Sequence, residues 1–468
     1  MGFGGVEHVD AIVIGGGLAG LRTALGLHDA GRSFVLLEAK PRLGGRVHTI
    51  RDPAFPGGTF DVGAKQIGQG YARTWSLIRR FQLSTVDEAA TLEPFVYLIG
   101  GEYVAASEWP TSGRNVLPGP MKSVPLPALA STYLTEHDPF TDLDGWRSRA
   151  ALVHDVSLRQ HLATNGFTDE AIRLLGLSVS GGASEHTSFL TLAQEHHRLL
   201  DELKSTSGGS MAIEKSATVG SGARVAIQNI VGGTEALTDA MASVFADRIH
   251  LNSPVISIQL PGQASVQAAV QCGNGTRFTA NHIISAVPLT SLRHIEITPA
   301  LPVPQAAAVA TMKYTTNTRV WAHVTKRFWE TDHLAPSTFS DEAFRTCFVM
   351  SDHHSGEHAA MFLMSGDAAR SIDENGDGIA HAVLRSFAAA RPSSEGALEP
   401  LITSSWATEP YVHGLRHSYD AGQMTAWQAT IAKPWHGLHF AGEHTREQDM
   451  GMEAALESAE RILRELGL

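Results

Sequence analysis

A glycine-rich turn near the start of this 468-residue chain constrains its fold more than any other feature. An apolar run over residues 9–14 leads into the sequence GGGLAG at 15–20, and an amphipathic helical pattern follows. A second apolar run over 33–37 ends at Glu38, 18 residues after the last glycine of the turn. This order of strand, G-x-G-x-x-G turn, helix, strand and carboxylate is the fingerprint of a dinucleotide-binding βαβ unit. We therefore expect an α/β fold with a parallel sheet at its start.

Each part of this turn has a physical role in holding a diphosphate. Gly15 permits the tight turn out of the strand, Gly17 lets the backbone approach a pyrophosphate, and Gly20 lets the helix pack closely on the strand. The N-terminus of the helix favours anions, because its N–H groups and its dipole point toward them. Glu38 is placed to accept hydrogen bonds from ribose hydroxyls.

The segments after Glu38 indicate which dinucleotide is bound. The loop at 43–46 (LGGR) carries two glycines, and its arginine can reach a phosphate. A nicotinamide cofactor does not require this element, whereas the longer flavin end of FAD continues past the first strand. A second glycine-bearing loop stands at 60–68 (FDVGAKQIG), and 439–445 (HFAGEHT) leads from a short strand to a carboxylate and then a helix. We expect an FAD site assembled from both ends of the chain.

Composition excludes several other classes of protein. Hydrophobic residues make up 43% and charged residues 18%, which excludes a largely disordered chain. The net charge of −12, without basic clusters, argues against a nucleic-acid partner. We expect a cytoplasmic protein without membrane association, because no apolar run reaches ~18 residues and the first residues do not resemble a signal peptide. The two cysteines and the 23 histidines form no metal-ligand motif, so no metal is expected.

Taken together, these motifs resemble those of the flavin-containing amine oxidase family, which includes monoamine, L-amino-acid and polyamine oxidases. The matching motifs are GGGLAG, LGGRV, DVGAKQIG, SPVISI, SAVPL and FAGEHT. The resemblance implies a Rossmann-like FAD-binding domain assembled from separated segments plus an α+β substrate-binding domain. The expected FAD-binding segments are residues 1–75, 218–292 and 401–468. The expected substrate-domain segments are a helical part with a possible lid at 76–217 and a sheet part at 293–400.

The resemblance also assigns residues to a noncovalently bound FAD. They are Gly15, Gly17, Leu18, Ala19, Gly20, Glu38, Ala39, Gly44, Gly45, Arg46, Gly63, Ala64, Lys65, Gln66, Val255, Gly442, Glu443 and Met452. In the family, the residue at Val255 meets the adenine and the carboxylate at Glu443 lies near the ribityl hydroxyls. The helix that starts near Met452 points its N-terminus at the flavin, where it stabilises negative charge on the reduced ring.

One departure from the family concerns catalysis. Arg319 stands where many members carry a lysine that holds a water near flavin N5. Alternation along the expected strand puts Arg319, Trp321 and His323 on one face. Arginine keeps its charge and binds carboxylates bidentately, so it does not substitute for lysine. The predicted catalytic residues are Arg319 and Lys65; the alternative for Arg319 is a structural salt bridge or a shifted register.

Further departures concern the flavin tether and the substrate. Leu415 stands where some members carry the cysteine that binds FAD covalently. Arg416 and Gly451 stand in place of the two tyrosines that form an aromatic cage in monoamine oxidases, which argues against a simple monoamine. Two arginines near the ring, Arg319 and Arg416, would suit an acidic substrate group. His413 and His417 adjoin this segment and are expected to have a surface or packing role.

The expected function is that of an FAD-dependent oxidase. It would remove a hydride from the carbon next to an amine of a small molecule, giving an imine, and O2 would reoxidise the flavin to give hydrogen peroxide. A homodimer is an option that the sequence leaves open. The alternative is a related dehydrogenase or desaturase that acts on a C–C or ring C–N bond with another acceptor. A flavoprotein without catalytic activity is disfavoured by the intact fingerprint.

Overall fold

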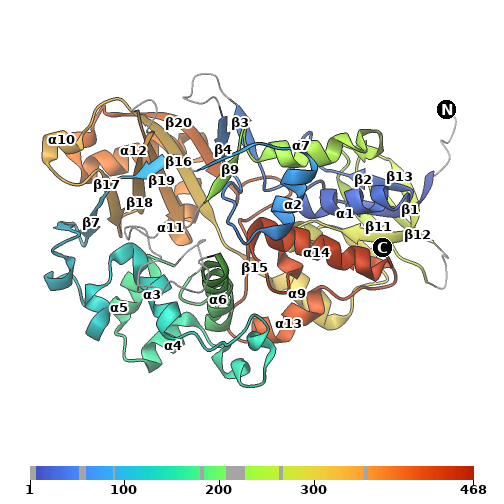
Figure 1. Cartoon of the computed structure of the whole chain (residues 1–468), viewed down its shortest axis with the longest axis horizontal. Coiled ribbons are helices and arrows are strands. Elements are labelled where there is room, and N and C mark those ends of the chain that lie inside the picture. Colours follow the sequence, from blue (N-terminus) through green and yellow to red (C-terminus); the bar gives the residue numbers. More distant parts are fainter. Residues whose placement is uncertain are drawn as a thin grey trace.

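A computed structural model describes residues 7–51, 59–87, 90–179, 184–206, 227–262, 267–352 and 357–468. In this part of the chain two large sheets form the framework, one at each side of Figure 1. The first sheet has the order β10-β2-β1-β13-β12-β11-β14, and β22 pairs with β13 beside β12. Its strands are β1 (Glu7–Ile14), β2 (Phe34–Leu37), β10 (Ile249–His250), β11 (Val255–Gln259), β12 (Ala268–Cys272), β13 (Arg277–Ser285), β14 (Glu296–Thr298) and β22 (Leu438–Phe440).

The predicted βαβ unit is present at the centre of this sheet. β1 runs parallel to β2 on one side and to β13 on the other. α1 (Leu18–Asp29) follows β1 directly and packs against α14 (Gly451–Glu465) and α7 (Glu235–Ser243). Figure 1 shows α1 and α14, the first and last helices in the described part of the chain, next to each other. A Cβ on Gly20 would lie 1.9 Å from the carbonyl oxygen of Gly15, so only glycine permits this packing of α1 on β1.

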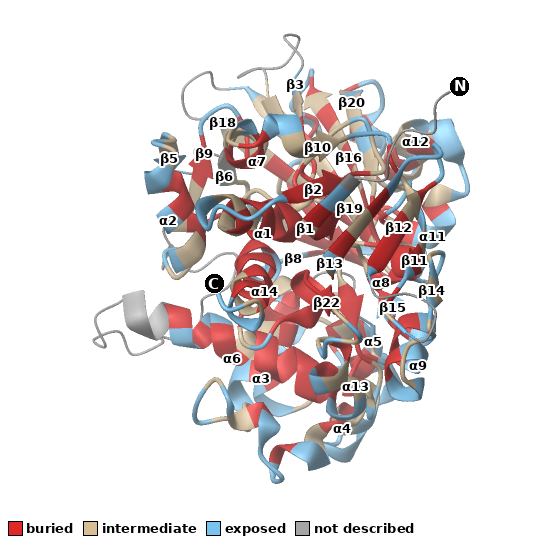
Figure 2. Ribbon diagram, turned by 90° about the vertical axis from the view of Figure 1, so that its right-hand side faces the viewer, coloured by how far each residue is buried: buried red, intermediate tan, exposed pale blue. Residues whose placement is uncertain are grey.

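Helices cover both faces of the first sheet. Ala11 and Val13 of β1 pack toward α1 and α14, whereas Ile12 and Ile14 face the other side. On that side lie α8 (Leu289–Leu292), α9 (Val303–Thr311) and α13 (Gln423–Ile431), whose buried side chains share one core with β1. Because both faces are buried there, β1 is apolar without a break from Ala11 to Ile14, as is typical of parallel sheets. Figure 2 shows this burial along β1 and β2.

Helices pack on both faces of the second sheet. It has the order β20-β16-β19-β18-β17-β7-β8, with β6 paired to β18. Val320 and Ala322 of β16 are buried against α11 (Asp367–Asp373) and α12 (Ile379–Ala390). α10 (Trp329–Asp332) follows β16. The strands are β6 (Ala90–Leu92), β7 (Phe95–Ile99), β8 (Glu102–Ala105), β16 (Asn317–Val324), β17 (Ser337–Ser340), β18 (Thr346–Asp352), β19 (His358–Ser365) and β20 (Leu398–Ser405).

A helical layer and three short ribbons complete the described part. The helices α3 (Leu129–Glu136), α4 (Leu158–Thr164), α5 (Asp169–Gly176) and α6 (Phe189–Thr206) share a core with Tyr97 of β7 and Phe339 of β17. α2 (Ala72–Arg80) packs on α14. The ribbons pair β3 (Thr49–Arg51) with β4 (Thr59–Asp61), β5 (Thr85–Asp87) with β9 (Gln228–Ile230), and β15 (Lys313–Tyr314) with β21 (His417–Ser418).

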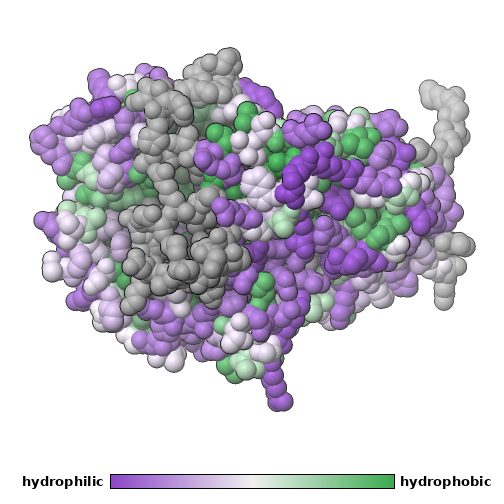
Figure 3. Space-filling view, in the orientation of Figure 1, coloured by the Kyte–Doolittle hydropathy of each residue, from purple (hydrophilic) through white to green (hydrophobic). Residues whose placement is uncertain are grey.

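The fold class is confirmed, and two details differ from the prediction. The run at 249–259, which we expected to be one strand, is divided into β10 and β11. β14 belongs to the first sheet, although the sequence places 296–298 in the substrate domain. The possible lid at 204–224 lies outside the described residues, except for the last turn of α6. No helix in the described ranges is long and apolar enough to cross a membrane. On the face in Figure 3, apolar side chains form separate small areas among hydrophilic ones.

A half-buried histidine in the helical layer makes stability depend on pH. His161 stacks on Phe189 with ring centroids 3.6 Å apart, and burial, with smaller contributions from His137 and His154, lowers the pKa of His161 to about 4. An unfolded histidine titrates near ~6.5, so acid favours the unfolded state between the two values. We expect His161 to remove about 1 kcal/mol of unfolding free energy between pH 7 and ~5.5. Urea unfolding at both pH values should show a smaller loss in His161→Gln, and an equal loss would contradict this assignment.

Candidate active site

The dinucleotide turn and the following glycine loop lie together. Gly17 caps the N-terminus of α1 without a side-chain hydrogen bond, which leaves this helix end suited to an anion. The N–H of Gly44 donates to the carbonyl of Gly16 at 2.9 Å, and Gly17 forms an isolated parallel bridge with Gly44. Two loops of the first predicted FAD-binding segment, Gly15 to Gly20 and Gly44 to Arg46, therefore form one surface.

Glu38 is held beside this surface by backbone donors. Its carboxylate accepts from the N–H of Gly16 at 2.6 Å and from the N–H of Lys40 at 2.9 Å. Burial raises the pKa of Glu38, and these two N–H groups oppose the shift. The carbonyl of Glu38 accepts from Ser253, two residues before Val255 at the start of β11. This hydrogen bond connects Glu38, expected at the ribose, with the segment just before Val255, expected at the adenine, although β2 and β11 are not adjacent in the sheet. Ala39 follows Glu38 directly.

The flavin loop packs against the arginine of the glycine loop. A Cβ on Gly63 would lie 2.1 Å from the carbonyl oxygen of Arg46, and the N–H of Ala64 donates to this same oxygen at 3.1 Å. Lys65 is half-buried and Gln66 is exposed just beyond. Met452, in the first turn of α14, shares a hydrophobic core with residues of α1 and with Ala64. α14 has no side-chain cap, so its N-terminus is also open to negative charge.

Glu443 follows Gly442 after β22 and is 6% exposed. Its carboxylate accepts from Arg46 at 3.3 Å and from the Nδ1 of His417 at 2.9 Å. Burial by itself would raise the pKa of Glu443, but His417 and Arg46 outweigh it and hold the pKa well below its ordinary value. His417 is 2% exposed, so of the predicted surface or packing role only the surface position is excluded for this residue, whereas His413 is exposed.

A second buried carboxylate neutralises an arginine that we expected to face the substrate. Glu195 of α6 lies 2.9 Å from Arg416 and 2.8 Å from Arg446. Burial alone would raise the pKa of Glu195, and these two guanidinium groups lower it. The expectation of two arginines available to an acidic substrate is therefore corrected. Arg416 is already paired within the protein, because α6 brings a carboxylate that the sequence pattern did not connect to it.

Arg319 differs from Arg416 in having no ion pair in the described part of the chain. β16 places Arg319, Trp321 and His323 on one face, opposite the buried Val320 and Ala322. The Nε of Arg319 and the Nε1 of Trp321 are buried and have no hydrogen-bond partner there. Burial lowers the pKa of Arg319. The expected alternative of a structural salt bridge is not present among these residues, and two unsatisfied donors point from one strand face.

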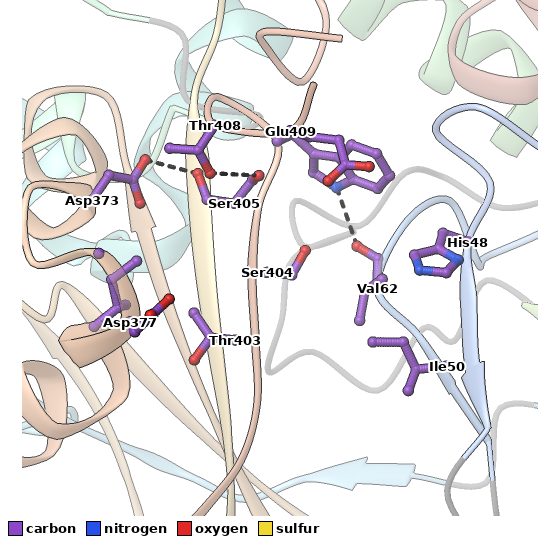
Figure 4. A pocket seen from close by; sticks show the side chains of 13 residues that line it. His48, Ile50, Val62, Asp373, Asp377, Thr403, Ser404, Ser405, Thr408 and Glu409 are labelled. Carbon is purple, nitrogen blue, oxygen red and sulfur yellow. Dashed lines mark hydrogen bonds between the residues drawn. The ribbon is translucent and has the colours of Figure 1, made fainter. Parts of the chain in front are cut away.

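The Arg319 face adjoins the flavin loop and a cavity. The ring of Trp321 contacts that of Phe60 edge-on, with centroids 5.4 Å apart, and Phe60 belongs to β4 at the start of the flavin loop. Ser404 of β20 pairs with Arg319 and lines a cavity of about 600 Å³. Figure 4 shows Ser404 on one side of this cavity and Val62 on the other. Lys65, the second predicted catalytic residue, is not among the residues that line it.

Comparison with known proteins identifies the family. The sequence profile of flavin-containing amine oxidoreductases matches residues 18–464. The chain belongs to this family. This amine oxidoreductase is 25% identical to human flavin-containing amine oxidase B over 98% of its own length and 86% of that protein. It is 24% identical to L-amino-acid oxidase of Notechis scutatus scutatus, over 97% of its own length and 85% of that protein.

A solved structure agrees with the fold of this amine oxidoreductase. Cyclohexylamine oxidase from Brevibacterium oxydans is 22% identical, with a TM-score of 0.76, and the match covers 98% of this chain and 100% of that one. Flavin-containing amine oxidoreductases use FAD, and the residues predicted to hold it lie together here. No group of three histidine, cysteine or acidic side chains suited to a metal occurs among the described residues.

Sequence reasoning missed three residues of the site. Glu195 and Arg446 form one ion-paired group with Arg416, and His417 pairs with Glu443. Glu195 lies on an amphipathic helix in which a charged residue carries no distinctive signal. The one signal available for His417 was its position two residues after Leu415, in a segment already expected to lie beside the flavin.

Proposed function

We propose that the protein is an FAD-dependent oxidase of an amine that also carries an acidic group. The juxtaposition of the predicted FAD-binding residues with Arg319, which has no ion pair among the described residues, carries this proposal. The residues fit FAD, because α1 and α14 begin without side-chain caps and Glu38 and Glu443 present carboxylates beside them. When bound, FAD accepts the hydride from the carbon that bears the amine and passes the electrons to O2.

The side chains of β16 orient the substrate in this proposal. The Nε of Arg319 is buried, and no counter-charge lies beside it among the described residues, which is unfavourable for a cation. A bound carboxylate would supply both the charge and an acceptor for this nitrogen. The indole N–H of Trp321 offers a second donor to the same group. Arg416 does not contribute, because Glu195 already neutralises it. Fixing one end of the substrate leaves its amine-bearing carbon in a defined place, which lowers the entropic part of the barrier.

Peroxide release tests the choice of O2 as acceptor. Purified enzyme supplied with amines that carry a carboxylate should produce hydrogen peroxide in proportion to the amine consumed. The same amines with the carboxylate converted to an amide form the matched control and should react poorly. Amine consumption without peroxide would favour the alternative, a dehydrogenase with another acceptor.

The flavin should be released by acid. Leu415 has no nucleophilic atom to bond to the flavin, and neither cysteine is near this position, since Cys272 and Cys347 lie buried in β12 and β18. Acid precipitation of the yellow protein should leave the flavin in the supernatant, measured by its absorbance. Flavin that remains with the washed, denatured pellet would contradict noncovalent binding.

A further inference from the structure

The His417 imidazole is buried, and only one of its two nitrogens has a hydrogen-bond partner among the described residues. Its Nδ1 lies 2.9 Å from Glu443, and its Nε2 has no hydrogen-bond partner in the described part of the chain. The ring of Tyr419 packs edge-on against that of His417, with centroids 5.2 Å apart, and β21 pairs His417 with Tyr314 of β15. The imidazole is therefore fixed in place while a polar atom remains open.

The protonation of Glu443 decides what this open atom can bind. The pKa of Glu443 lies well below its ordinary value, so its carboxylate is ionised and accepts hydrogen bonds. His417 must then donate from Nδ1, and in the neutral imidazole Nε2 carries a lone pair and accepts. A phosphate oxygen has no hydrogen to offer such an atom, whereas a hydroxyl group has one. A hydroxyl also accepts, so it satisfies Nε2 in either protonation state.

The charged groups around His417 come from four segments of the chain. They are Arg46 of the glycine loop, Glu195 of α6, Arg416 beside β21, and Glu443, His444 and Arg446 after β22. The Nδ1 of His444 and the hydroxyl of Tyr419 are likewise buried without a partner. Arg46 joins this group to the predicted FAD surface through its contact with Glu443. The open polar atoms thus lie where the middle of the cofactor is expected.

We propose that the Nε2 of His417 binds a hydroxyl of the ribityl chain of FAD, with Glu443 as the positioning residue that fixes the imidazole. This inference depends on FAD as the cofactor and is independent of the substrate proposed above. It assigns to His417 a role in cofactor recognition that is distinct from the phosphate contact expected of Arg46.

Two variants test the contacts of the two imidazole nitrogens separately. In His417→Asn the amide nitrogen replaces Nδ1, which keeps the contact with Glu443 and removes the contact with FAD. In His417→Gln the amide group replaces Nε2 and the contact with Glu443 is lost. His413→Asn is the matched control, because His413 is exposed four residues away. Removal of one hydrogen bond should weaken FAD binding by about 3- to 10-fold in His417→Asn, and less in His417→Gln.

Reconstitution with FAD analogues that each lack one ribityl hydroxyl tests the contact directly. The dissociation constant is measured by flavin fluorescence, and thermal unfolding of the FAD-free proteins checks that each variant is folded. The wild type should bind one analogue about 3- to 10-fold more weakly than FAD, and His417→Asn should bind this analogue and FAD equally. Equal FAD affinity of folded His417→Asn and wild type would overturn the proposal. So would a loss of affinity that is the same for FAD and for every analogue.

Discussion

Arg319→Ala should slow anaerobic flavin reduction by the native substrate about 30- to 900-fold, which corresponds to ~2–4 kcal/mol of transition-state stabilisation. Arg319 is half-buried, its Nε is buried and lacks a partner among the described residues, and Trp321 presents a second unsatisfied donor on the same strand face. Removing Arg319 would leave the acidic group of the substrate unpaired in a buried place. The measurement is stopped-flow absorbance of the flavin at saturating substrate.

Companion variants separate geometry from charge at this position. Arg319→Lys keeps the charge and loses the planar fork, so it should recover only part of the rate. Arg327→Ala removes an exposed arginine near the end of the same strand and should leave the rate unchanged. FAD content and melting temperature of each variant show whether the site is intact. A native reduction rate in folded Arg319→Ala would refute the assignment of this residue to substrate binding.

Glu38→Ala should weaken FAD binding about 10- to 100-fold, because the ribose hydroxyls lose an ionised acceptor worth ~1.5–3 kcal/mol. The carboxylate is held toward the dinucleotide turn by the N–H groups of Gly16 and Lys40. Glu38→Gln keeps an acceptor but not the charge, so its affinity should lie between those of wild type and alanine. Titration of the FAD-free proteins by fluorescence measures these constants.

A matched control is available for the Glu38 variants. Glu108 is exposed and remote from the predicted FAD residues, so Glu108→Ala should bind FAD as the wild type does. Thermal unfolding without FAD reports how much of the effect comes from the lost contact with Gly16. Wild-type affinity in folded Glu38→Ala would mean that the βαβ unit does not hold the ribose in the expected way.

Local patterns were sufficient to predict the βαβ unit at the centre of the first sheet. The glycines of the turn, the carboxylate at Glu38 and the apolar run of β1 each meet one local requirement, and these residues lie close together along the chain. Gly63 is similar, since its neighbour Arg46 lies on the preceding loop. Such features can be predicted from the sequence because the residues that act together also lie close together along the chain.

The charge pairing inside the site could not be predicted in the same way. The contact of Glu195 with Arg416 joins residues that are remote in sequence, and its formation depends on how α6 docks beside β21. The contact of His417 with Glu443 was not predicted, because the two residues meet only after β21 and β22 are placed in space. Long-range packing, which no periodicity encodes, decides which charges remain available to a ligand. In this chain it neutralises Arg416 and leaves Arg319 without an ion pair in the described part.

Anaerobic flavin bleaching tests the central claim most directly, because it reports substrate oxidation whatever the final acceptor is. The purified holoenzyme is mixed without oxygen with a panel of amines, amino acids and conjugated ring compounds, and the flavin absorbance is followed. The account predicts bleaching by an amine that carries an acidic group, faster than by the matching amine without that group. Bleaching by ring compounds alone, with every amine inert, would contradict it.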